Sequence, residues 1–264
     1  MIEFSGLFLA LLVGVVLGLI GSGGSIFAVP IFTYFFLLDE KLATGYSLFV
    51  VGCAALIGAI KQYQKKKIDF KAALIFGLPA IFSVTIIRSI VVPMLPEILF
   101  DFNGFILTRR MTILGLFSVV MIPSGLAMTR SNKINYNSFS KNYNYPLIII
   151  EGLVIGSITG LVGAGGGFLI VPVLVILLKI NIKTAIGTSL LIIASKSLIG
   201  FFLGDVLALI IDWDFLISFT IIAVSGVFIG NYLNSLVDAK KLRYGFGYFI
   251  LFMSVFILFQ EIIN

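Results

Sequence analysis

The sequence contains no histidine and a single cysteine among its 264 residues, and only 11% of its residues are charged. Without histidine the chain lacks the commonest metal ligand and the commonest proton shuttle near neutral pH, so we expect no metal site and no cofactor. One cysteine excludes a disulfide framework within the chain, and we interpret Cys53, which lies in an apolar run, as a small packing residue. No Walker motif is present, so we expect no ATP hydrolysis by the chain itself.

What the chain has in excess is apolar residues, at 60% of the sequence and a mean hydropathy of +1.18. Soluble proteins average about 45–50% apolar and about 25% charged residues. We therefore predict an all-α polytopic membrane protein. The formal charge of +6 arises from loops between apolar segments, so we expect no nucleic-acid binding. The start, Met1–Phe4, has no basic region, and we expect no cleaved signal peptide.

Part of the sequence occurs twice. Residues 18–58 align with 160–200 without a gap at an offset of 142, with 15 identities over 41 positions. Each copy interrupts an apolar stretch with a glycine-rich break and reaches a proline soon after it, at Pro30 and Pro172. A duplicated, glycine-broken hydrophobic segment is typical of transporters built from two repeats. We therefore divide the chain into a first membrane repeat (1–128), a polar cytoplasmic linker (129–145) and a second membrane repeat (146–264).

Hydropathy predicts five apolar segments in each repeat. A helix needs roughly 20 apolar residues to cross the bilayer core, and the segment directly after each break is shorter than that. We expect these two short segments to be re-entrant or discontinuous helices. The segments are 4–20, 26–38, 43–60, 72–94 and 111–128 in the first repeat, and 147–162, 167–179, 184–203, 215–237 and 243–260 in the second.

Loop charges distinguish between two topologies. If each broken element crosses the membrane once, the loop lysines and arginines divide 8 to 8 between the two sides. If each broken element folds back to its own side, they divide 13 to 3. Cytoplasmic loops carry an excess of positive residues, which favours the second arrangement. We therefore predict inverted repeats with both termini outside.

The paired signatures resemble the TauE/SafE (sulfite exporter) family. Each has a glycine-rich break, a proline and then a Gly-x-Ser-Leu sequence, at Gly45–Leu48 in the first copy and Gly187–Leu190 in the second. Tyr46 stands where threonine is usual, so the second copy fits better, and the segment from Pro79 to Arg110 looks unlike the common family pattern. The resemblance implies a multi-pass carrier in the cell membrane for small sulfur-containing or carboxylated anions such as sulfite or sulfoacetate.

The breaks are the first candidate binding residues. Glycine permits positive φ and close approach of the backbone, and the exposed N–H groups at the start of a half-helix attract anions. Two breaks meeting near the midplane would form a cradle from backbone alone. The alternative is that the glycines serve only close helix packing. The break residues are Gly21, Ser22, Gly23, Gly24 and Ser25, and Gly163, Ala164, Gly165, Gly166 and Gly167.

Two cations, Arg88 and Lys196, lie well inside apolar segments. A charge at mid-membrane costs at least about 2.5–3.5 kcal/mol on insertion scales, so it normally faces the protein interior and has a function. We expect both to bind the anion. Arg88 has two alternatives, reaching toward an interface or pairing with an acid such as Asp101.

Smaller polar residues complete the candidate site. Ser47, Thr188 and Ser189 would hydrogen-bond either the anion or their own helix, and Ser189 shares a helical face with Lys196.

We expect acids at the end of the third segment of the second repeat to be solvated. Glu151 is the one acidic residue that we consider for proton coupling. The acids expected to be solvated are Asp205, Asp212 and Asp214.

These features predict a secondary transporter of a small anion rather than an enzyme. An intramembrane enzyme would need Lys196 to pair with Ser195 or Ser197, but neighbours on a helix point about 100° apart. An anion channel, or a carrier of a carboxylate without sulfur, remains the alternative. As partners we expect a small anion, a coupling ion (proton or sodium) and membrane lipids, and the sequence leaves a homodimer open.

Overall fold

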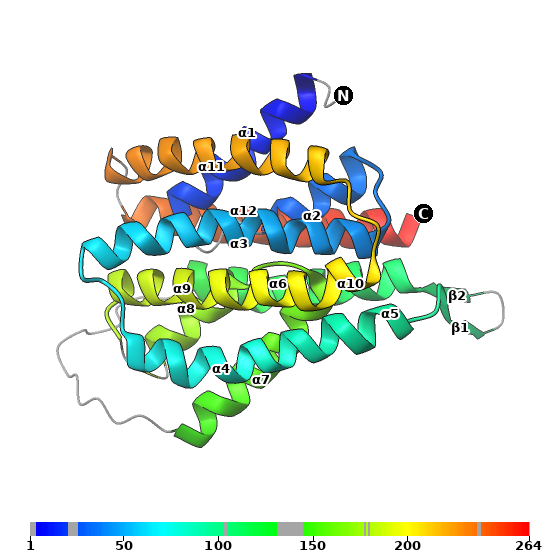
Figure 1. The fold of residues 1–264 in the computed structure, drawn as a ribbon, viewed down its shortest axis with the longest axis horizontal. Coiled ribbons are helices and arrows are strands. Elements are labelled where there is room, and N and C mark those ends of the chain that lie inside the picture. Colours follow the sequence, from blue (N-terminus) through cyan, green and yellow to red (C-terminus); the bar gives the residue numbers. More distant parts are fainter. Residues whose placement is uncertain are drawn as a thin grey trace.

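The computed structural model describes residues 4–20, 26–102, 105–130, 145–176, 178, 180–236 and 239–263. They form helices joined by short loops, together with one small β-hairpin (Figure 1). The first half contains α1 (Phe4–Ile20), α2 (Ala28–Pro30), η2 (Ile31–Phe35), α3 (Glu40–Gln64), α4 (Phe70–Ile86), η3 (Ile87–Val91), α5 (Val92–Met94), β1 (Ile98–Phe102), β2 (Phe105–Thr108) and α6 (Arg109–Arg130). The second half contains α7 (Tyr145–Val162), α8 (Gly167–Ile176), α9 (Ile182–Gly200), η4 (Phe201–Asp205), α10 (Val206–Ala208), α11 (Trp213–Leu236) and α12 (Ala239–Ile263).

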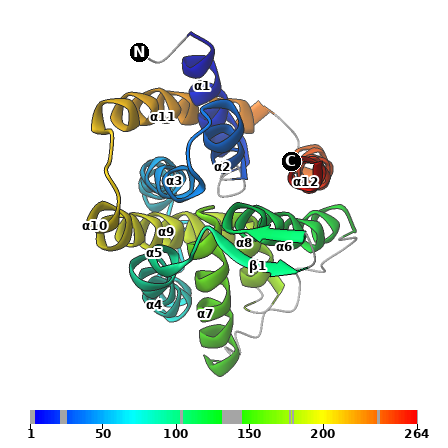
Figure 2. The same cartoon turned by 90° about the vertical axis from the view of Figure 1, so that its right-hand side faces the viewer.

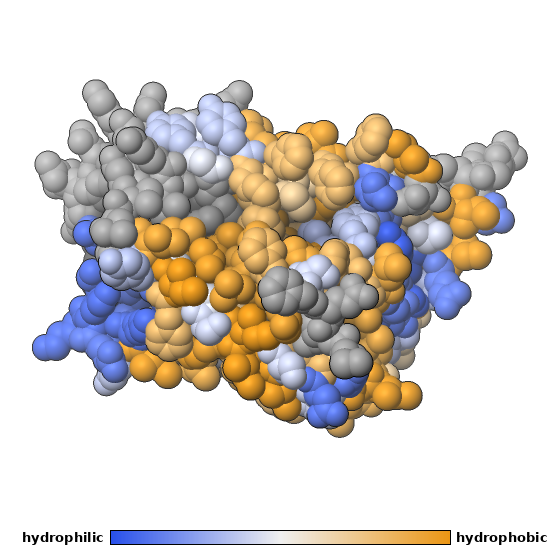
Figure 3. Space-filling view, turned by 90° about the horizontal axis from the view of Figure 1, so that it is seen from above, coloured by the Kyte–Doolittle hydropathy of each residue, from blue (hydrophilic) through white to orange (hydrophobic). Residues whose placement is uncertain are grey.

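Six of the described helices are long and apolar enough to cross a membrane. The continuous helix from Phe70 to Met94 has 25 residues and a mean hydropathy of 2.1. At 1.5 Å per residue it is about 37 Å long, which exceeds the roughly 30 Å of the hydrocarbon core. Figure 3 shows hydrophobic side chains in the middle of the molecule and hydrophilic ones at its two ends. The chain is therefore a polytopic helical membrane protein, as its composition predicts.

Equivalent residues begin the third helix of each predicted repeat. The Asp39 carboxylate accepts a hydrogen bond from the Lys41 amide at the start of α3, and the Asn181 side chain accepts one from the Lys183 amide at the start of α9. Such N-caps satisfy an amide that has no partner within the helix. Asp39 and Asn181 are separated by the same 142 residues as the two sequence copies, so these two equivalent positions have the same capping role.

Helix contacts define the relative directions of the main helices. On α3, the glycines at 45, 52 and 58 face Asp205, Leu198 and Leu190 respectively, so α3 and α9 are antiparallel. Gly152 and Gly160 on α7 face Phe76 and Val84 on α4, so these two helices are parallel. Glycines 14 and 18 on α1 face residues 223 and 227 on α11, so α1 and α11 are also parallel. Figures 1 and 2 show these pairs packed side by side.

The structure differs from the sequence predictions in three local features. The helix after the first break is shorter than predicted and covers Ala28–Phe35 rather than 26–38. Three helical stretches, η2, η3 and η4, have the wider π-helical hydrogen-bond pattern. Residues 98–102 and 105–108, where no element was predicted, pair as two antiparallel strands with Phe100 opposite Leu107, and they project from one end of the helices. The predicted linker 129–145 lies almost entirely outside the described residues.

Residues that follow the two breaks share one buried cluster. Ile26 and Val29, after the first break, belong to it together with Ala164 and Phe168 at the second break. The cluster is completed by side chains from α6 and α12, including Phe117. The Phe27 ring stacks on Phe249 of α12, with centroids 4.2 Å apart. The fold thus brings the two duplicated elements to the same part of the interior.

Candidate functional site

The second glycine-rich break is a buried stretch of non-helical backbone. Helix α7 ends at Val162, and α8 begins at Gly167. Gly163 and Gly166 have φ values of +71° and +70°, a region that side-chain-bearing residues rarely adopt. Every residue from 163 to 167 is buried. The prediction that glycine provides positive φ at the break is confirmed at these two positions.

Close packing also requires glycine in this break. A β-carbon at Gly163 would lie 2.3 Å from Cβ of Thr44 on α3, and one at Gly166 would lie 2.2 Å from Cγ2 of Thr159 on α7. Both distances are far shorter than a van der Waals contact. The break is therefore held between α3 on one side and the end of α7 on the other.

The start of α8 presents backbone amides next to this break. The Gly166 carbonyl accepts hydrogen bonds from the amides of Leu169 and Ile170. Amides in the first turn of a helix have no partner within that helix, and they form its positive dipole end. Helix α8 has ten residues, Gly167–Ile176, enough to give this end a substantial dipole. The partially positive end of α8 therefore lies directly beside the break.

Lys196 lies on α9 directly beside the break. Its side chain is fully buried, and its Nζ donates a hydrogen bond to Oγ1 of Thr159 at 2.6 Å. A β-carbon at Gly166 would lie 3.6 Å from the same Nζ. Among the residues that the structure describes, no carboxylate forms an ion pair with Lys196. Within the described part of the chain, the Lys196 amine is therefore buried without an acidic partner.

Arg88 is also fully buried, but it has a counter-ion. Its guanidinium binds both carboxylate oxygens of Asp205, with Nε 2.9 Å from Oδ2 and Nη2 bonded to Oδ1. Nη1 donates to Oγ1 of Thr44 at 2.9 Å and to the Gly160 carbonyl at 3.4 Å. The prediction that Asp205 is solvated is wrong, because its side chain is 2% exposed. Of the three roles considered for Arg88 (anion binding, reaching toward an interface and pairing with an acid), pairing with an acid is observed, although the acid is Asp205 and not Asp101.

The two cations lie at the same end of α7. Arg88 contacts Gly160, and Lys196 contacts the preceding residue, Thr159. Thr44, which binds Arg88, also packs against Gly163 of the break. The sequence-predicted cations are thus brought together around one break. The two side chains differ in their partners, because Arg88 is paired with the Asp205 carboxylate, whereas Lys196 has no acidic partner among the described residues.

The structure places the other predicted site residues elsewhere or in local bonds. Thr188 accepts a hydrogen bond from the Asp69 amide at 2.9 Å, which ties α9 to the start of α4. Ser189 donates to the Ile186 carbonyl of its own helix. Ser47 is fully buried, and its hydroxyl has no hydrogen-bond partner among the described residues. The first-break residues Gly21, Ser22, Gly23, Gly24 and Ser25 lie outside the described residues.

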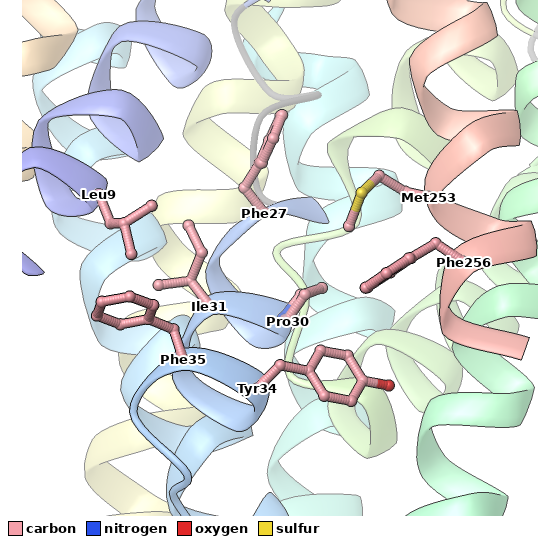
Figure 4. Close-up of a pocket in the computed structure, with 8 residues that line it drawn as sticks. All are labelled: Leu9, Phe27, Pro30, Ile31, Tyr34, Phe35, Met253 and Phe256. Atoms are coloured by element: carbon pink, nitrogen blue, oxygen red, sulfur yellow. The ribbon is translucent and has the colours of Figure 1, made fainter. Parts of the chain in front are cut away.

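An apolar pocket of about 280 Å³ lies beside the helix that follows the first break (Figure 4). Its one polar lining group is the Tyr34 hydroxyl, which donates to Glu261 at 2.9 Å. A lining of this kind does not suit an anion. The remaining lining residues are Leu9, Phe27, Pro30, Ile31, Phe35, Met253 and Phe256.

Sequence reasoning missed three residues of this region, namely Thr44, Thr159 and Asp205. Thr159 had a usable signal, because it is a hydroxyl residue inside an apolar segment four residues before the break. Thr44 and Asp205 gave no such signal in the sequence, because both lie near the ends of apolar segments, where polar residues are common. Their role depends on the approach of α3, α4 and α9, which no local pattern indicates.

Comparison with known proteins identifies a family. A family model described as "Sulfite exporter TauE/SafE" matches residues 6–257. The resemblance inferred from the glycine-rich signatures is therefore confirmed over nearly the whole chain.

Similar curated proteins come from bacteria and archaea. A "Probable membrane transporter protein" of Xylella fastidiosa is 27% identical over 95% of this chain and 92% of its own length. A "Probable membrane transporter protein MJ0441" of Methanocaldococcus jannaschii is 29% identical over 73% of this chain and 70% of its own. A "Probable membrane transporter protein YdhB" of Bacillus subtilis is 25% identical over 88% of this chain and 90% of its own length. No solved structure matches the chain significantly.

Proposed function

Because the chain belongs to the TauE/SafE sulfite exporter family, we propose that it is a secondary transporter of a small sulfur-containing anion across the cell membrane. Sulfite, sulfoacetate and other sulfonates are the substrates that the family implies. Family membership and the names of the relatives support transport in general. The choice of an anion rests on the residues around the second break.

The uncompensated ammonium of Lys196 carries this proposal. A buried charge is costly unless it is paired, and the described residues provide Lys196 with one neutral hydroxyl, that of Thr159. A bound anion would supply the missing counter-ion. The amides at the start of α8 would add donors to the same oxyanion, since Gly166 lies next to Lys196.

We further propose that both breaks contribute to the anion site at the interface of two inverted repeats. Gly77 on α4 faces Ile192 on α9, and Gly200 at the end of α9 faces Val84 on α4, so α4 and α9 are parallel. Because α7 is also parallel to α4, α7 and α9 run in the same direction. The chain between the end of α7 and the start of α9 must therefore run back in the opposite direction. This favours an α8 that re-enters on the side from which α7 came. The cluster shared by Ile26, Val29, Ala164 and Phe168 supports convergence of the two breaks. Rocking of one repeat against the other would then expose the anion alternately.

The test is uptake of sulfite, sulfoacetate, thiosulfate and acetate by purified protein in proteoliposomes. We expect the sulfur anions to be transported, and Lys196→Ala to lower transport by at least ten-fold, on the order of the loss of one charge-assisted hydrogen bond. Lys65→Ala, which removes an exposed lysine, is the matched control and should transport normally. Unchanged flux in Lys196→Ala would show that the anion binds elsewhere.

The same vesicles distinguish the alternatives. A carrier exchanges internal for external anion, so preloading with unlabelled substrate should accelerate uptake of labelled substrate. A channel would show no such acceleration. Transport of acetate with rejection of all sulfur anions would indicate a carboxylate carrier.

A further inference from the structure

The Arg88–Asp205 pair connects the two halves of the chain at a buried point. Arg88 lies in η3, Asp205 is the last residue of η4, and the two π-helical stretches contact each other. The side chains are 0% and 2% exposed. π-Helical turns inside α-helices are rare and occur frequently at functional sites. Here two of them meet around one ion pair.

In this arrangement four of the five N–H groups of the guanidinium are bonded within the protein. Nε and Nη2 are bonded to Asp205, and Nη1 is bonded to Thr44 and the Gly160 carbonyl. The edge formed by Nε and Nη2, which can bind two oxygens at once, can therefore receive an anion only if Asp205 gives up its place. Separating the pair would leave two buried charges without partners, which is strongly unfavourable.

Two simultaneous events would remove that penalty. A proton on Asp205 removes the negative charge, and an anion at Arg88 replaces it. We propose that Asp205 is a proton-binding site of this transporter and that its protonation releases Arg88 to bind the substrate anion. The inference rests on the proposed anion transport and assigns its coupling ion.

The step balances in charge and atoms. A hydronium ion transfers one proton to an Asp205 carboxylate oxygen and leaves as water, and the hydrogen bonds from Nε and Nη2 of Arg88 pass to the anion. No other bond changes. The cations available to the anion then increase from Lys196 alone to Lys196 and Arg88, so the protonated state suits a dianion.

A sodium ion fits this place less well than a proton. Sodium, like other hard cations, needs several oxygen ligands, whereas the Asp205 carboxylate faces guanidinium nitrogens. Within the described part of the chain, no group of three or more acidic or cysteine side chains could hold a metal ion.

Other ionisable groups on the neighbouring helices are engaged elsewhere or distant along the chain. On α3, Glu40 pairs with Arg109, and Lys41 donates to the Pro93 carbonyl. The Tyr46 hydroxyl accepts from the Asp212 amide. Lys196 on α9 is the exception, because it belongs to the same proposed anion site as Arg88. The other groups lie well away from the pair along the chain, namely Lys71 on α4, Tyr145 and Glu151 on α7, and Lys183 on α9.

Binding of sulfoacetate and thiosulfate to the purified protein between about pH 6 and 8 tests this inference, because both probes stay fully ionised over that range. We expect wild-type affinity to rise as the pH falls, by up to about ten-fold per pH unit. Asp205→Asn, which resembles the protonated acid, should bind tightly and with a much weaker pH dependence than the wild type, any remaining dependence arising from Lys196 in the same site. Asp214→Asn, at an exposed aspartate, should behave as wild type. A wild-type pH dependence that persists in Asp205→Asn would overturn the proposal.

Calorimetry of the wild-type protein gives a second readout that does not depend on any variant folding. Titrations in buffers of different ionisation enthalpy measure proton uptake, and we expect up to one proton per anion bound. Binding without proton uptake would overturn the proton site and leave anion transport standing. An absence of binding for every sulfur anion would overturn both.

Discussion

At the scale of single residues, the second break depends on two glycines for two separate reasons. Gly163 and Gly166 have positive φ, which costs other residues roughly 1–2 kcal/mol. Each also faces a threonine so closely that a methyl group would overlap with it. Strain and overlap add at the same position. The break therefore tolerates no side chain at either glycine.

Gly163→Ala and Gly166→Ala should each lower the midpoint of thermal unfolding and reduce anion binding, because the backbone beside Lys196 must move. Gly115→Ala is the matched control, since a β-carbon there would meet no described atom within 4 Å. Alanine in place of a helical glycine contributes about 1 kcal/mol, so this control should unfold at an unchanged or higher temperature. Thermal unfolding in detergent, with binding at a fixed temperature, measures both effects. Equal behaviour of all three variants would contradict the role given to positive φ.

At the scale of elements, side chains from each half of the chain hold the start of a helix in the other half. The Tyr46 hydroxyl on α3 accepts a hydrogen bond from the Asp212 amide, just before α11. Thr188 on α9 accepts one from the Asp69 amide, just before α4. Tyr46 and Thr188 are separated by 142 residues and are thus equivalent in the two copies. This equivalence explains how tyrosine can stand in a position where threonine is usual.

Tyr46→Phe and Thr188→Val should each destabilise the protein by about 1 kcal/mol, the contribution of one hydrogen bond. Neither should change anion affinity, because these hydroxyls serve helix starts. Thermal unfolding and sulfoacetate binding on the same samples measure the two properties independently. A large loss of anion affinity in Thr188→Val with unchanged stability would contradict this prediction and indicate that Thr188 binds the anion.

At the scale of the whole molecule, polar residues gather at two opposite ends with an apolar middle between them (Figure 3). The loop between α3 and α4 carries several lysines at one end, while the starts of α3 and α6 lie at the other (Figure 1). The positive-inside rule then places the lysine-rich end in the cytoplasm. This orientation remains a prediction.

Cysteine accessibility in cells tests the orientation. In a Cys53→Ala background, Tyr63→Cys and Lys241→Cys should be protected from a membrane-impermeant thiol reagent added outside. Asp214→Cys, at the start of α11, should react with it. Labelling of positions 63 and 241 from opposite sides would contradict the inverted topology and require each broken element to cross the membrane.

Several features of the site could be predicted from the sequence. Lys196, Arg88 and the second break were identified because charge and glycine are unexpected within apolar segments, so each is a local anomaly that needs no partner to be noticed. The boundaries of the break were correct for the same reason. The hairpin at 98–108 was missed because its short apolar strands give no helical signal, and the solvated state assigned to Asp205 was wrong because its partner lies 117 residues away.

The sequence by itself determined the class of protein, the duplication and the position of the second break, since composition and glycine content act locally along the chain. Only the tertiary structure decided which of the two buried cations has a counter-ion. Arg88 and Lys196 are equally anomalous in sequence, yet Arg88 meets Asp205 and Lys196 meets the neutral hydroxyl of Thr159. The electrostatic state of a buried charge depends on its neighbours in space, and those are set by the way α3, α4, α7 and α9 pack around the break.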